Sequence, residues 1–134
     1  MSGARSVAVA TVATAATLLV LDLVWLGVVA TSLYDSLGTL KRPVVFWPAA
    51  ALFYTLYVAA IVIHAELGAS GVRDAFRRGA GLGLVAYGTY ELTNWAVLRD
   101  WPAQLVVPDA AWGIALTAIA AAVGKAALDR TGAR

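Results

Sequence analysis

The chain has 134 residues, of which 61% are hydrophobic and only 13% are charged, and its mean hydropathy is +0.78. A soluble domain carries about 25% charged residues to keep its surface hydrated, so this composition excludes a water-soluble globule. The net charge of +2 is small and no basic stripe runs beside aromatic residues, which argues against nucleic acid as a partner. With no cysteine, disulfides and Cys-ligated metals are excluded too. The composition predicts one small membrane domain in contact with the lipid bilayer.

Four apolar stretches follow one another along the chain, each near the roughly 20 residues that cross a hydrocarbon core. They run from about 7 to 30, 44 to 65, 80 to 98 and 106 to 128. The first stretch is too long for the apolar region of a signal peptide and contains Asp22, so we expect it to be retained. The predicted fold is an all-α membrane protein, an antiparallel bundle of four transmembrane helices in a single domain, residues 1 to 134.

The basic residues predict the orientation of this bundle. Seven of the ten flank one side of the predicted membrane: Arg5, Arg73, Arg77, Arg78, Lys125, Arg130 and Arg134. The positive-inside rule then places both termini and the middle connector in the cytoplasm, in a multi-pass protein of the cell inner membrane.

Three carboxylates fall inside the apolar stretches or at their edges. Asp22 and Glu91 lie in the outer halves of the first and third spans, and Asp109 lies near the outer start of the fourth. Ionisable groups inside a bilayer are costly, face the bundle interior or water, and mark functional sites. We therefore expect these three acids to belong to one site.

Helical spacing adds neighbours to the acids, because residues three or four apart share a helix face. Trp25 and Trp112 follow Asp22 and Asp109 at three residues, and Tyr54 on the second span lies at a matching depth. The predicted ligand-binding pocket faces outward and is formed by Asp22, Trp25, Tyr54, Tyr87, Glu91, Asn94, Trp95, Asp109 and Trp112.

Four short motifs in this order carry a family resemblance: DLVWLG (22–27), YELTN (90–94), DWP (100–102) and DAAWG (109–113). Together they resemble a bacterial membrane family catalogued as domain-of-unknown-function family 2177, over nearly the whole chain. The resemblance implies a four-span fold and the choice of acidic and aromatic site residues, and it implies no activity.

Simpler structural explanations compete with a site. Asp109 follows Pro108 and would suit the first turn of a helix, where proline is tolerated and an acid complements the helix dipole. Asp22 and Glu91 could instead only hold helices together by hydrogen bonds. One histidine and no cysteine argue against a zinc site, so we predict no metal, although an all-oxygen cation site is chemically possible.

Three functional classes remain open from these residues. Carboxylates beside Trp and Tyr can hold a small cationic or amphiphilic ligand, for binding or transport, by charge and cation–π attraction. Paired carboxylates could also act as acid and base in a membrane-embedded enzyme that modifies lipids. In the third class the polar cluster only locks a structural or accessory subunit. No cofactor is indicated, and a homo-oligomer is a further candidate assembly.

Overall fold

The computed structural model describes residues 3–132, and this part of the chain is built from helices without any strand. Two long helices end in π-helical segments: α1 (Gly3–Val24) continues as η1 (Trp25–Val29), and α3 (Trp47–Ile61) continues as η3 (Val62–Glu66). The other elements are α2 (Thr31–Asp35), the 3₁₀ segment η2 (Gly38–Leu40), α4 (Val72–Val97) and α5 (Ala103–Thr131).

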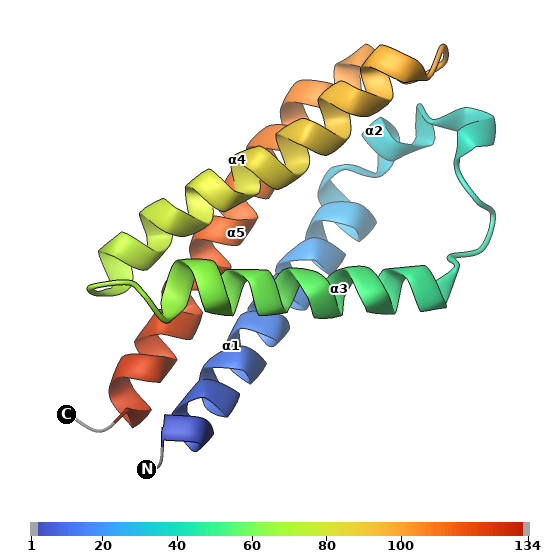
Figure 1. Ribbon diagram of the computed structural model, residues 1–134. Coiled ribbons are helices and arrows are strands. Elements are labelled where there is room, and N and C mark those ends of the chain that lie inside the picture. Colours follow the sequence, from blue (N-terminus) through green and yellow to red (C-terminus); the bar gives the residue numbers. More distant parts are fainter. Residues whose placement is uncertain (1–2, 133–134) are drawn as a thin grey trace.

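Three of the long helices, α1, α5 and α4, lie side by side, with α5 in the middle, and α3 crosses them obliquely (Figure 1). The start of α1 and the end of α5 lie at one end of the molecule, which we call the termini end. The end of α1, the end of α4 and the start of α5 lie at the opposite end, which we call the far end.

Glycines on α4 let it approach α5 closely. A Cβ atom at Gly79 would lie 2.6 Å from the carbonyl oxygen of Thr117, and one at Gly83 would collide with the backbone of Gly113. Small residues at helix contacts allow close backbone packing, which is a main source of helix association in lipid. The α4–α5 pair is accordingly the most extensive helix contact in the structure.

Three helical segments are long and apolar enough to cross a membrane: Gly3–Val29, Trp47–Glu66 and Ala103–Thr131. These confirm several membrane-spanning helices. α4 is 26 residues long, but it carries basic residues in its first two turns and Glu91 and Asn94 near its end. It begins at Val72, before the expected residue 80, because an apolar run marks where lipid contact begins and not where the helix begins. A fourth span along α4 therefore stays a prediction.

The start of α5 excludes one of the structural explanations. The helix begins at Ala103, before the expected residue 106, and Pro108 lies inside it. Proline lacks the amide hydrogen that would bond the carbonyl four residues earlier, so the helix tolerates one missing bond there. Asp109 is thus the seventh residue of α5, and its interpretation as a first-turn acid is wrong.

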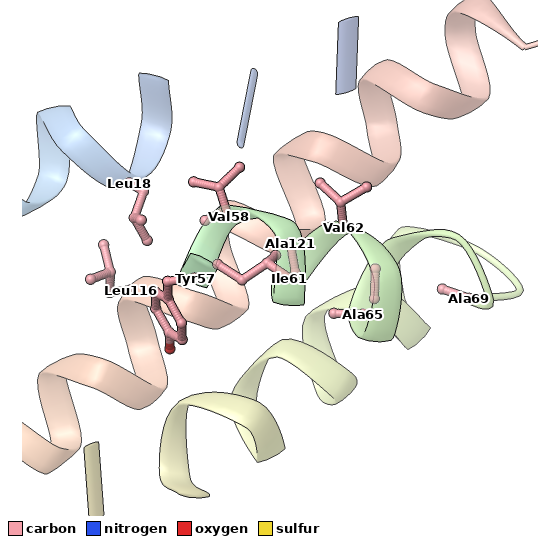
Figure 2. Packing of buried hydrophobic residues seen from close by; sticks show 11 residues of the cluster. Leu18, Tyr57, Val58, Ile61, Val62, Ala65, Ala69, Leu116 and Ala121 are labelled. Atoms are coloured by element: carbon pink, nitrogen blue, oxygen red, sulfur yellow. The ribbon is translucent and has the colours of Figure 1, made fainter. Parts of the chain in front are cut away.

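An apolar core joins α1, α3 with η3, and α5 in the middle of the molecule (Figure 2). Leu18, Ile61 and Leu116 are fully buried there, together with Ala120 and Ala121. Polar side chains are buried on both sides of this core, toward the far end and toward the termini end. The core therefore separates two polar regions.

Candidate functional site

One buried stripe on α1 positions side chains in both polar regions. Ala10, Thr14, Leu18 and Asp22 recur every fourth residue and are all buried. Residues four apart share one helix face, so the stripe faces the other helices along its whole length. Eight residues span about 12 Å of helix, which is the axial separation of Thr14 and Asp22.

Asp22 is bonded by side chains from two other helices. Tyr54 on α3 donates its hydroxyl hydrogen to Oδ2, and Trp112 on α5 donates its Nε1–H to Oδ1 at 3.3 Å. The residue is only 8% exposed. Both carboxylate oxygens therefore have a donor, as burial of a charged group requires.

A tryptophan stack connects Asp22 to Asp109. The rings of Trp25 and Trp112 are parallel within 4°, with centroids 4.8 Å apart. The indole N–H of Trp25 points to the hydroxyl oxygen of Tyr34 at 3.4 Å, and Tyr34 donates its own hydrogen to Oδ1 of Asp109. Asp109 is 3% exposed. Asp22 and Asp109 thus lie in one continuous polar and aromatic network.

Tyr34 lies on α2, beyond the first membrane-spanning segment. Burial and then its hydrogen bond to the Asp109 carboxyl raise the pKa of Tyr34 well above its usual value. The hydroxyl stays protonated at physiological pH and acts as a permanent donor to Asp109.

Glu91 is fully buried, and an N–H donor reaches only one of its oxygens. Oε2 accepts the indole N–H of Trp101 at 2.9 Å, whereas no N–H or hydroxyl group among the described residues donates to Oε1. The carboxyl group lies within hydrogen-bonding reach of the Asp109 carboxyl, so a proton on either group would join the two. A buried carboxyl oxygen without a partner is rare and costs free energy unless a proton or a ligand occupies it.

We call these bonded and stacked side chains the far-end network: Asp22, Trp25, Tyr34, Tyr54, Glu91, Trp101, Asp109 and Trp112.

Three residues expected in the pocket lie at the edge of this network or outside it. The Tyr87 ring packs over Gly113, where a Cβ atom would collide with it, and is half-buried. Asn94 is half-buried and lies next to Tyr90. Trp95 is 51% exposed, and no hydrogen bond or ring contact in the described structure joins it to the acids.

The network contains no basic side chain. The three ion pairs found in residues 3–132 join Lys41 to Asp35, Arg78 to Asp74 and Lys125 to Asp129, away from the network acids. No three acidic or histidine side chains in that range converge as metal ligands.

A shallow groove on the α4–α5 pair leads to Glu91. It has a volume of about 310 Å³ and is lined by Leu84, Gly88, Glu91, Leu92, Val106, Val107, Ala110, Ala111 and Ile114. Glu91 is the single ionisable residue of this lining, and Leu84 and Val107 at its walls are mostly exposed. The groove is apolar throughout, and Glu91 lines it without exposing its buried carboxyl group.

Sequence reasoning did not place Tyr34 and Trp101 in the site, because neither follows one of the three acids at three or four residues. Each follows a span closely in the sequence, and each carries a hydrogen that a buried acid can accept. Buried Tyr and Trp side chains usually find such a partner. Which acid they reach depends on how the connectors fold back, and spacing within a helix contains no information on that.

Comparison with known proteins identifies the family. No curated protein and no solved structure matches the chain. Residues 7–126 match the family model described as "Predicted membrane protein (DUF2177)", and the chain belongs to this family.

Proposed function

We propose that the far-end network is a proton-exchanging site for a small amphiphilic cation, in a binding or transport protein of the inner membrane. The observation that carries the proposal is the unpartnered Oε1 of fully buried Glu91, beside the buried carboxyl of Asp109. Two adjacent carboxyls in a low-dielectric site cannot both be ionised, so they retain a proton when no cation is bound. An arriving cation would take the place of that proton.

The shape of the α4–α5 groove supports an amphiphilic ligand. Its apolar walls suit a hydrocarbon tail, and a small opening of this lining would bring a positively charged head to the buried Glu91 carboxyl. The absence of a basic partner for the network acids in the described structure leaves their negative charge available. Such a ligand would enter sideways from the lipid.

The orientation belongs to the same proposal. We take α4 as the fourth span, the termini end as cytoplasmic and the far end as outward. The chain has no cysteine, so single cysteines at Thr39 and Ser70, both exposed, report accessibility without background. A membrane-impermeant maleimide on intact cells should label Thr39→Cys and spare Ser70→Cys. The reverse labelling would overturn the orientation.

Binding is tested with dodecyltrimethylammonium on protein in phosphatidylcholine nanodiscs. Titration calorimetry in two buffers of different protonation enthalpy counts released protons. We expect wild type to release about one proton per bound cation through linkage, and dodecanol, which has the same tail without the charge, to release none.

Glu91→Gln keeps the shape of the side chain and removes its charge. We expect it to stay folded and to lose proton release and at least tenfold in cation affinity, since a coulombic contact in a low-dielectric site contributes about 1.4 kcal/mol or more. Asp35→Asn, which changes an exposed acid on α2, is the matched control and should bind as wild type does. Equal binding by wild type and Glu91→Gln would overturn the proposal.

Asp22 fits the scaffold alternative better than the ligand site. Both of its oxygens accept hydrogen bonds from neighbouring helices, so Asp22 holds α1, α3 and α5 together. Neither oxygen is left without a donor that a ligand would supply. We therefore assign ligand exchange to Glu91 and Asp109 and a structural role to Asp22. Asp22→Asn should weaken the fold modestly and leave proton release intact.

A further inference from the structure

A second buried acid lies on the other side of the apolar core. Glu66 is fully buried at the end of η3, where the π-helical turn, closed by the Leu67 amide and the Val62 carbonyl at 3.0 Å, precedes the connector to α4. Its carboxyl lies against Gly124 of α5 so closely that a Cβ atom there would overlap it. Oε1 is bonded to Thr14 of α1, and Oε2 has no partner among the described residues.

The hydroxyl of Thr14 cannot serve both of its neighbours as a donor. Thr14 Oγ1 lies 2.9 Å from the carbonyl oxygen of Ala10 and also within hydrogen-bond distance of Glu66 Oε1. A hydroxyl has one hydrogen and can accept through its lone pairs, whereas a backbone carbonyl can only accept. If Thr14 donates to Ala10, the hydrogen between Thr14 and Glu66 must come from Glu66.

Other threonines show that the bond to the fourth preceding carbonyl is the usual one in this protein. Thr11, Thr17, Thr55 and Thr131 all donate to that carbonyl at 2.7–2.8 Å. Helical threonines in apolar surroundings favour this bond because no water competes for the hydroxyl. The same assignment for Thr14 leaves its lone pairs facing Glu66.

Tyr57, a member of the apolar core, supplies an internal parallel. Its hydroxyl meets Thr117 Oγ1, and Thr117 bonds the Gly113 carbonyl at 2.7 Å. Because the carbonyl can only accept, Thr117 donates to it and Tyr57 donates to Thr117. In the Glu66–Thr14–Ala10 arrangement the carboxyl occupies the position that the phenol has in Tyr57–Thr117–Gly113.

The charged groups around Glu66 offer a route by which a proton can leave. On α5, Lys125 interacts with the Glu66 carboxyl, but its Nζ is paired with Asp129 at 3.0 Å. On α4, Arg78 reaches the connector at Gly68 and pairs with Asp74, and α1 presents the uncharged Thr14. Asp129 is about half exposed, so the Lys125–Asp129 ion pair extends from the buried Lys125 to water.

We infer that Glu66 is a second proton-binding site, occupied by a proton in this structure and separated from Glu91 and Asp109 by the apolar core. Release of that proton leaves a carboxylate that Lys125 can neutralise by exchanging its partner Asp129 for Glu66. The inference rests on the Glu66–Thr14–Ala10 geometry and stands whether or not the far-end network binds a cation.

The glutamate count makes this inference directly testable. Glu66 and Glu91 are the two glutamates of the chain, so protein labelled with ¹³C at the glutamate carboxyl has two labelled sites. In Glu91→Gln, infrared spectra at neutral pH should show one labelled band, at the position of a protonated carboxylic acid. A carboxylate band in its place would overturn the inference.

Three further variants, each in the Glu91→Gln background, protect the test from folding effects. Thr14→Val removes the acceptor of the Glu66 hydrogen, and the protonated-acid band should shift to higher frequency. Thr17→Val, which removes only a bond to a preceding carbonyl, should leave it unchanged. Lys125→Met should also leave it unchanged, because the acid is already neutral. A protonated band that arises only in Lys125→Met would show an ionised Glu66 paired with Lys125, which contradicts the inference.

Discussion

The two buried polar regions differ in what supplies their hydrogen-bond partners. At the far end, Tyr34 and Trp101, which donate to Asp109 and Glu91, come from α2 and from the connector before α5. At the termini end, Thr14 and Gly124, which surround Glu66, belong to the long helices α1 and α5. Connectors move at lower cost than packed helices, because they bury less surface and open locally.

The difference implies distinct dynamics for the two acid sites. A movement of α2 or of the connector would release Asp109 or Glu91 from its aromatic donor without disturbing the apolar core. Access to Glu66 requires either separation of α1 from α5 or a proton path along Lys125 and Asp129. This difference supports the proposed ligand exchange at the far end and the proposed storage of a proton at the termini end.

The largest expected effect on stability comes from filling the space at Gly124 that the Glu66 carboxyl occupies. Gly124→Ala places a methyl group where the Thr14 hydroxyl and the Glu66 carboxyl lie, and both are held by rigid helices. Overpacking of this kind typically costs 1–3 kcal/mol, so we expect the free energy of unfolding to fall by about 2 kcal/mol. Denaturant unfolding in detergent micelles, followed by circular dichroism, measures it.

Gly81→Ala is the matched control for this helix substitution. A Cβ atom at Gly81 meets nothing within 4 Å, and alanine favours the helix over glycine by about 1 kcal/mol. We expect it to be neutral or stabilising. A Gly124→Ala variant as stable as the Gly81→Ala variant would show that the termini end is not rigid, and the contrast between the two ends would fail.

A smaller loss is expected when the far end loses an aromatic donor. Trp101→Phe keeps a ring against Tyr90, whose centroid lies 5.7 Å away, but removes the hydrogen that Glu91 accepts. Because a connector residue can rearrange, we expect a loss of about 1 kcal/mol in the free energy of unfolding. The same denaturant measurement serves, with Trp47→Phe, at a 69% exposed site, as the control. A loss larger than that of Gly124→Ala would reverse the ranking of the two ends.

Much of the fold was predictable from the sequence because hydropathy reports directly on contact with lipid. The apolar runs predicted the helices α1, α3 and α5, and the motifs predicted the family that residues 7–126 match. The first turns of α4 were missed because Arg73, Asp74, Arg77 and Arg78 are charged yet lie in the helix. The oblique crossing of α3 could not be predicted, since it depends on packing between side chains distant in sequence.

The site was predictable to the extent that an acid in an apolar run is unusual. That reasoning singled out Asp22 and Glu91, and the structure bonds both to aromatic donors. Glu66 was not singled out, because it follows the second apolar run by one residue and resembles an ordinary interfacial acid. Its burial depends on the π-helical turn of η3, which has no signature in the apolar pattern.

The smallest expected effect concerns the connectors themselves. At the termini end, Asp74 accepts the Ser70 amide hydrogen at 2.9 Å and pairs with Arg78 Nε at 3.1 Å, which pins the connector between η3 and α4. The Ser70 amide and then Arg78 lower the pKa of Asp74 below its ordinary value of 3.8. At the far end, Asp35 makes one ion pair with Lys41, with both side chains at least half exposed.

Asp74→Asn should therefore lower the melting temperature slightly, and by more than Asp35→Asn does. The folded-state pKa of Asp74 is depressed, so its contribution is fully present above the unfolded-state pKa and is lost as pH falls through the folded-state value. The gap between wild type and Asp74→Asn should consequently close as the pH is lowered below 3.8. Melting curves in detergent between neutral and acidic pH measure this gap for both variants. If Asp35→Asn lowers the melting temperature by more than Asp74→Asn does, the termini-end connector is not the more firmly held of the two. The same holds if the gap between wild type and Asp74→Asn persists in acid, because the ionised carboxylate of Asp74 would then contribute nothing that an amide lacks.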